Sequence, residues 1–249
     1  MNRVRVRFSK LGKIRFTSHR DVARIWERSL RRAGLPIAYT EGFSPRPKLS
    51  FGLALSTGYE SLGEYLDVAL RDGDGVASPA VDAMPALVAP GLPDGIAVQA
   101  AVALDPGAES LQQAVTSCTW HIEIGDVRPS TAAEALADAL AAPEISLTRE
   151  RKGRTVTDDV RPAIVAARVL AAGGAPGGSG TEIEVELATQ PRALRPAELV
   201  TAVTPPAATW TVARVTRINQ WTQAGGARRE VIPLAPAATL PPHVRARAS

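Results

Sequence analysis

Cysteine and histidine, the side chains that most often bind transition metals, are scarce in this sequence. The chain has one cysteine, Cys118, and three histidines, His19, His121 and His243. One cysteine cannot form an intramolecular disulfide or supply the several thiolates of an iron–sulfur cluster. The histidines also lack the spacing of metal ligands. We therefore expect no metal and no other cofactor.

Long hydrophobic runs and catalytic sequence motifs are missing as well. No apolar run reaches the roughly 18 residues of a membrane-spanning helix, and the start, MNRVRVRFSK, has no apolar signal region. The glycine-rich GGAPGGSG lacks the lysine of a phosphate-binding loop, and no nucleophile elbow or dinucleotide fingerprint occurs. The sequence therefore predicts a cytoplasmic protein with no membrane partner.

Positive charge is abundant, but only in the first part of the chain. The first fifty residues contain 13 Lys and Arg against three acidic residues, whereas the other 199 residues carry 16 against 22. Eight of the eleven aromatic residues also lie before residue 66. Basic segments interleaved with aromatics are typical of proteins that bind nucleic acid. Most of these aromatics, however, fall on alternating or helical core positions, so we expect them to build the core.

Hydrophobic periodicity in the first half predicts the order strand, helix, strand, strand, helix, strand. RVRVRF alternates strictly, and the segment that starts at Ser18 has helical spacing up to Gly34. LSFGLAL and EYLDVAL read as a hairpin, followed by a weaker helix and a strand. The same order recurs beyond the linker DPGAESLQQ.

We therefore predict an α+β protein of two tandem ferredoxin-like (βαββαβ) units with antiparallel sheets. The expected boundaries are 1–105 for a basic, aromatic-rich domain and 112–221 for a second domain. The Pro-, Ala- and Arg-rich residues 222–249 have no core-forming pattern and are expected to form a disordered tail.

Strand alternation also predicts which side chains line the sheet face without helices. In the first half this basic face would show Arg3, Arg5 and Arg7 with Tyr65, Asp67 and Gln99. In the second half the acidic face would show His121 and Glu123 with Glu182, Glu184 and Glu186. The two faces could pack together as an interdomain interface, or each could face solvent. Both alternatives remain open at this stage.

The candidate nucleic-acid-binding residues are cations of the first helix and of the loop after it. In YTEGFSPRPKLSF, prolines 45 and 47 restrict the backbone, so the loop would present its cations with little entropy to lose on binding. A merely rigid connection is the alternative. The predicted binding residues are Arg20, Arg24, Arg28, Arg31, Arg46 and Lys48.

His19 is the one candidate catalytic residue. It stands at the start of the predicted helix, where an imidazole can act as a general base or bind a phosphate. A capping or packing role is the alternative, because no partner residue is visible in the sequence.

The segments SHRD, GFSPRPKLSF and GYESLGEYLD, within residues 3–70, resemble the start of the radical SAM-linked family. This is a domain of unknown function encoded beside, or fused to, a cobalamin-binding radical SAM protein. The resemblance implies an accessory or substrate-handling role for a radical SAM partner, and it supplies no catalytic residues.

Three hypotheses follow from these observations. The first is a non-catalytic protein that binds structured RNA through its basic half and presents it to a radical SAM partner. The second is a metal-independent endoribonuclease of the repeat-associated ferredoxin-like type, with His19 as general base, because RFTSHRDVARIWERSLRRAG looks faintly like the start of those proteins. The third is a protein–protein adaptor that docks on an acidic partner.

Overall fold

The computed structural model describes residues 2–71, 81–151, 153–173 and 180–234. The chain divides into two compact units, with the division along the sequence between Gln112 and Gln113. Residues 58–62 cluster with the second unit, and residues 229–234 cluster with the first. Each unit is described separately below.

The first unit contains four strands and two principal helices. In chain order these are β1 (Asn2–Lys10), α1 (His19–Arg32), β2 (Leu49–Phe51), β3 (Glu60–Leu70), α2 (Met84–Val88) and β4 (Ile96–Leu104). The strand order is β4-β1-β3, with β2 on β3, and the pairs β1–β4 and β2–β3 are antiparallel. Short 3-10 turns precede α1 at Gly12–Phe16 and flank α2 at Val81–Ala83 and Ala89–Gly91, and α3 (Leu111–Ala114) follows the linker.

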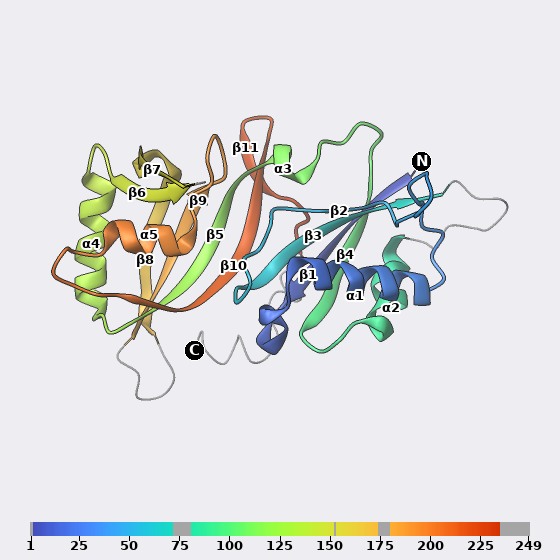
Figure 1. The fold of residues 1–249 in the computed structure, drawn as a ribbon, viewed down its shortest axis with the longest axis horizontal. Helices are drawn as coiled ribbons and strands as arrows, with labels where there is room; N and C mark the ends of the chain where they lie inside the picture. Colours follow the sequence, from blue (N-terminus) through green and yellow to red (C-terminus); the bar gives the residue numbers. More distant parts are fainter. Residues whose placement is uncertain (1, 72–80, 152, 174–179, 235–249) are drawn as a thin grey trace. The chain divides into compact units, whose positions relative to one another are not determined.

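The core of the first unit lies between the helices and one face of these strands (Figure 1). The even-numbered residues of β1 supply Val4, Val6 and Phe8, because alternate side chains of a strand share one face. Trp26 of α1 is fully buried against Phe8, with ring centroids 4.9 Å apart and an interplanar angle of 61°. Met84 of α2 packs in the same cluster.

The ends of α1 follow local rules that the sequence carries. Ser18 caps the helix by accepting a hydrogen bond from the Asp21 amide at 3.2 Å. Gly34, just after the helix, has a φ of +67°, a left-handed conformation that glycine adopts without strain. These features confirm the expected start and end of the helix.

The opposite face of β1 carries the three arginines, as the alternation predicts, but they do not form an open basic surface. Arg5 is buried and makes two hydrogen bonds to the carboxylate of Asp67 at 2.7 and 2.8 Å. Arg7 is also buried, and it donates to Gln99, to Glu230 and to the carbonyl of residue 232. These partners all belong to the first unit, and two of them, Asp67 and Gln99, are residues that the alternation places on this face, so Arg5 and Arg7 are neither bare nor exposed.

The second unit contains β5 (Val115–Gly125), α4 (Pro129–Ala141), β8 (Ile164–Gly173), β9 (Gly180–Ala188), α5 (Pro196–Val203) and β10 (Thr211–Ala224). Its strand order is β10-β5-β9-β8, and all three neighbouring pairs are antiparallel. The first residues of β3, Glu60 and Ser61, cluster with this unit and pair in parallel with β10.

The core of the second unit is built from apolar side chains at every second position of its strands. Ile122 of β5 stands opposite Ile183 of β9, and both are fully buried. Helix α4 contacts β8 and β9, and α5 contacts β10 (Figure 1). Leu136 and Leu199 are the buried leucines of these two helices. The described part of the chain is therefore mixed α+β with mostly antiparallel strands, which confirms the expected class.

Two segments differ from the sequence-based expectation. Residues 146–159 form a separate antiparallel hairpin, β6 (Ser146–Arg151) with β7 (Arg154–Asp159), which the recurring order of elements does not include. The tail predicted from residue 222 starts too early, because β10 continues to Ala224 and β11 (Ala227–Glu230) follows. The periodic pattern missed β11 because its ARRE sequence has no apolar face. Residues 235–249 of the predicted tail lie outside the described residues.

No described helix is both long enough and apolar enough to cross a membrane.

The buried Arg5–Asp67 pair predicts a large effect of a nearly isosteric substitution. Asp67→Asn leaves the Arg5 guanidinium in place without its counter-charge, in a site where the two side chains are only 9% and 6% exposed. We expect the free energy of unfolding, measured by urea denaturation, to fall by about 3–5 kcal/mol. Arg24→Gln, which breaks an exposed ion pair, is the control and should leave it nearly unchanged. Equal effects of the two substitutions would contradict this assignment.

Candidate nucleic-acid interface

Helix α1 presents a stripe of cations to solvent. Arg20, Arg24, Arg28 and Arg31 stand at i, i+4, i+8 and i+11, a spacing that places them on one side of an α-helix. All four are exposed, while the opposite side of the helix buries Val22, Trp26, Ser29 and Leu30. The hydrophobic side of α1 thus determines which way the arginines point.

The stripe is only weakly neutralised by neighbouring acidic groups. Arg24 pairs with Asp21 at 3.0 Å, but both side chains are more than half exposed. The pKa of the Asp21 carboxyl is lowered, first by its hydrogen bond with the Ser18 hydroxyl and then by Arg24 and Arg20. Exposed pairs of this kind exchange partners at little cost. An incoming phosphate can therefore compete for the Arg24 guanidinium.

Hydrogen bonds join the two ends of the loop after α1, residues 39–48, and the tip of the loop is exposed to solvent. The Thr40 amide donates to the Arg46 carbonyl at 2.8 Å, and the Arg46 amide donates to the Thr40 hydroxyl at 3.0 Å. The Lys48 amide donates to the Ala38 carbonyl at 2.8 Å. The side chains of Arg46 and Lys48 are both exposed, so the loop presents the two predicted cations from a backbone that is already ordered.

Phe43 is the residue of this loop that sequence reasoning missed. It is fully exposed at the tip, and Tyr39 at the base of the loop is also exposed. The expectation that the early aromatics build the core holds for Phe8, Trp26 and Tyr65 but not for these two. The available signal was the position of Phe43 between Gly42 and Ser44, where no apolar alternation supports a buried strand.

His19, the candidate general base, stands at the edge of an open depression. The depression has a volume of about 450 Å³ and is lined by His19, Gln112 and the run Leu49–Ala54. The imidazole meets the Phe51 ring edge-on, with centroids 5.0 Å apart and an interplanar angle of 78°. Gln112 supports the floor, because its amide donates to the Phe51 carbonyl at 2.7 Å.

A smaller cavity beside this depression contains two buried charged residues. It has a volume of about 20 Å³, room for about one water molecule, and Lys10 and Glu64 line it together with His19. The Lys10 ammonium donates to the carbonyls of Arg15 and Thr17 at 3.1 and 3.2 Å. Burial lowers the pKa of Lys10, and the nearby Glu64 carboxylate partly opposes that effect.

The burial of Lys10 and Glu64 could have been predicted from their positions in the strand alternation. Lys10 has the same strand parity as Phe8, and Glu64 has the same parity as Leu62 and Leu66, so both fall on core-facing positions. A lysine and a glutamate on the apolar faces of two strands rarely stay buried unless they are paired. The Lys10 hydrogen bonds also anchor the segment that leads into α1 and His19.

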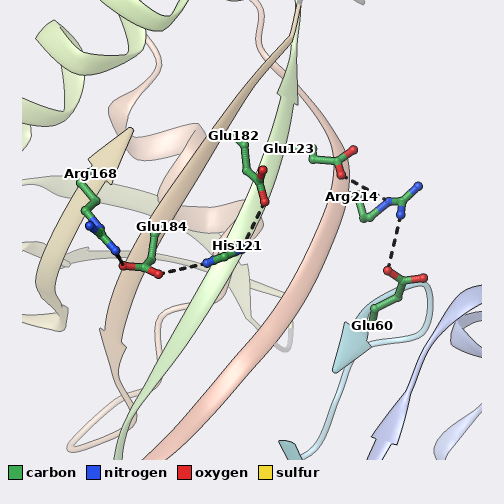
Figure 2. A network of polar contacts seen from close by, with 7 residues as sticks. All are labelled: Glu60, His121, Glu123, Arg168, Glu182, Glu184 and Arg214. Carbon is green, nitrogen blue, oxygen red and sulfur yellow. Dashed lines mark hydrogen bonds and ion pairs between the residues drawn. The ribbon is translucent and has the colours of Figure 1, made fainter. Parts of the chain in front are cut away.

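The second unit has its own polar cluster on the strand face predicted from alternation (Figure 2). His121 lies between two carboxylates, with Nδ1 3.2 Å from Glu182 and Nε2 3.0 Å from Glu184. Arg168 pairs with Glu184 at 2.7 Å. Burial alone would lower the pKa of His121, but its contacts with Glu182 and Glu184 together outweigh burial and raise it.

Arg214 extends this cluster along the same unit. Its guanidinium lies 3.6 Å from Glu123 and 3.7 Å from Glu60 (Figure 2). Glu186 pairs with Arg228 at 3.0 Å. The acidic face of the second unit therefore has cationic partners of its own, just as Arg5 and Arg7 have acidic or polar partners within the first unit.

No group of His, Cys, Asp and Glu side chains in the described parts of the chain has an arrangement that could hold a metal ion. The lone Cys118 is buried.

Comparison with known families places the chain in one of them. Residues 3–196 match the family described as an uncharacterized protein conserved in bacteria, DUF2344. The match covers well over half of the chain, so the protein belongs to DUF2344. It includes all six predicted binding residues and His19. No curated protein matches the chain.

The His121 cluster predicts how stability depends on pH. Because the folded-state pKa of His121 is raised, its contribution is fully present below the unfolded pKa of about 6.5 and is lost as the pH rises through the folded value. We therefore expect the unfolding temperature of the wild type to fall as the pH rises from about 6.5 through the raised folded-state pKa of His121. The His121→Gln variant should lose part of this pH dependence. Identical profiles for His121→Gln and the wild type would contradict the assignment.

Proposed function

We propose that this protein binds single-stranded segments of RNA through the exposed cations of α1 and of the loop 39–48. The observation that carries this proposal is the fully exposed Phe43 on a closed loop that also presents Arg46 and Lys48. Proteins that bind single strands combine cations that follow the backbone with aromatic side chains on which bases stack. A purely electrostatic surface has no need of an aromatic ring beside its cations, whereas a single-strand-binding surface does.

Other features of the first unit favour RNA over an acidic protein partner. The four arginines extend along two to three turns of α1, which suits a regular series of phosphates. Arg15 lies over the ring of Phe16, another exposed aromatic, with its guanidinium carbon 4.6 Å from the ring centroid. Cations and aromatics thus recur together on the surface of this unit, a combination that provides both phosphate and base contacts.

We also propose that each unit has the ferredoxin-like fold. The order β1-α1-β2-β3-α2-β4 in the first unit supports this, as does the strand order β4-β1-β3 with β2 on β3. In the second unit, β5-α4-β8-β9-α5-β10 with strand order β10-β5-β9-β8 supports the same proposal, the β6–β7 hairpin being an insertion.

The partner we propose is a radical SAM enzyme, to which the protein would present bound RNA. The resemblance of SHRD, GFSPRPKLSF and GYESLGEYLD to the radical SAM-linked family is what supports this partner.

A metal-independent endoribonuclease is the second candidate function. The observation that favours it is the shared cavity of His19, Lys10 and Glu64, which brings an imidazole close to two buried ionisable groups. Incubation of RNA with the purified protein in the presence of a chelator separates the candidates. Intact RNA supports the binding role, while cleavage that disappears in His19→Ala would replace it with the nuclease.

The binding proposal predicts a steep dependence of affinity on salt. Each single-strand phosphate contact contributes a slope of about 0.7 log units of affinity per log unit of salt. Replacing Arg46 and Lys48 together with alanine should reduce the slope by about one to two contacts without unfolding the protein, because both side chains are exposed. Anisotropy titrations of labelled RNA at several salt concentrations measure this.

A charge-matched control uses two exposed arginines of the second unit, Arg128 and Arg154. Replacing these two arginines with alanine removes the same net charge as the loop variant. It should change the affinity for RNA only slightly, through the protein's overall electrostatic field, and it should leave the number of phosphate contacts, and so the salt slope, unchanged. Equal slopes for the two double variants, or no RNA binding by the wild type, would contradict the proposal and favour a protein adaptor.

Phe43 predicts a separate, salt-independent effect. Phe43→Ala should weaken RNA binding by about 1–3 kcal/mol, the usual value of one base stacked on an aromatic ring, at every salt concentration. The salt slope should stay the same, because no charge is removed. Phe43→Trp is the rescue variant and should restore binding. An affinity unchanged by Phe43→Ala would show that this ring does not contact RNA.

A further inference from the structure

The depression beside His19 suits a ligand that is flat, largely apolar and polar at its edge. Its walls come from Leu49, Phe51 and Leu53, and its polar groups from His19, Ser50 and Gln112. A volume of about 450 Å³ lies within the usual range for small-molecule sites. Apolar walls with a few polar groups are typical of sites that bind planar ring systems.

Cations stand directly beside this depression in the sequence. Arg20 follows His19, and Lys48 precedes Leu49, and both side chains are exposed. These two cations adjoin lining residues along the chain, which suits a ligand that carries a phosphate next to its ring. A nucleotide unit of RNA has this composition: a planar base, joined through its sugar to a phosphate.

We infer that this depression binds one unpaired nucleobase of RNA, with its flanking phosphates held by Arg20 and Lys48. This inference rests on the proposed RNA binding and adds a defined base site to it. The nearly perpendicular rings of His19 and Phe51 suit one stacking contact and one hydrogen bond to the base, rather than a sandwich between two parallel rings.

The surrounding contacts keep this site in shape before a base arrives. Lys10 ties the carbonyls of Arg15 and Thr17, which fixes the chain that leads to His19. On the other side, the Gly52 amide donates to the Tyr65 carbonyl at 2.9 Å, and Gln112 holds the Phe51 carbonyl. A preformed site loses little entropy on binding, which favours capture of a flexible single strand.

The test compares two chains of equal charge: tetrauridylate and a ribose-phosphate chain of the same length without bases. Anisotropy titrations give the ratio of their affinities, which isolates the contribution of the bases from that of the phosphates. Ala54→Trp fills the depression from an exposed position, and His19→Ala removes the rim imidazole. Ala86→Trp, at an exposed site of α2, is the control for the added ring.

We expect tetrauridylate to bind the wild type more tightly than the base-free chain, and the ratio to fall about fivefold or more in Ala54→Trp, the loss of one stacked base. His19→Ala should also lower the ratio, Ala86→Trp should not, and the salt slope should stay constant in all variants. A ratio that Ala54→Trp and His19→Ala leave unchanged would overturn the base site while RNA binding stands. No binding of either chain by the wild type would overturn both proposals.

Free nucleotides carry the same base and phosphate groups as RNA. A competition experiment distinguishes which of the two is the ligand of the depression. Uridine monophosphate should displace tetrauridylate only at far higher concentration than the oligonucleotide itself, since it lacks the neighbouring phosphates. Displacement at equal concentration would overturn RNA as the source of the base.

Discussion

The packing of Trp26 against Phe8 is the contact on which the candidate interface depends. Trp26 is fully buried, and its edge-to-face contact with Phe8 fixes the rotation of α1 over β1. Once the apolar side of α1 faces the sheet, the arginines spaced around Arg24 and Arg28 must face solvent. The same rotation brings His19, the first residue of the helix, beside Phe51 and the depression. A hydrophobic contact thus determines the position of a charged surface.

Charge in this protein is used in two physically different ways. Arg5 and Arg7 are buried with acidic or polar partners, so they contribute to the architecture of the first unit and are not accessible to a ligand. The cations of α1 and of the loop are exposed, and the one ion pair formed by Arg24 is easily exchanged. The basic character of the first fifty residues therefore overstates the accessible charge. The fraction that remains exposed lies beside exposed aromatics, and that coincidence supports RNA as the ligand.

The sequence predicted elements that depend on local rules and missed features that depend on distant contacts. Alternation in RVRVRF and the cap at Ser18 correctly located β1 and α1. Alternation also placed Arg5 and Asp67 on the same face, but it could not show that these two side chains, more than sixty residues apart, would pair with each other and be buried. The exposure of the four predicted cations of α1 followed from helical spacing. The depression beside His19 could not be predicted, because its lining residues come from three segments that only the fold brings together: His19, the run Leu49–Ala54 and Gln112.

Photo-crosslinking tests the central claim, RNA binding by α1 and the loop, most directly. RNA that contains 4-thiouridine is irradiated with the purified full-length protein, and mass spectrometry locates the modified peptides. The account predicts crosslinks within residues 16–54, concentrated at the exposed aromatic Phe43 and at Phe51 in the depression. Crosslinks confined to the second unit would contradict this account. So would crosslinks that are no more abundant than those formed when an excess of a competitor polyanion is present.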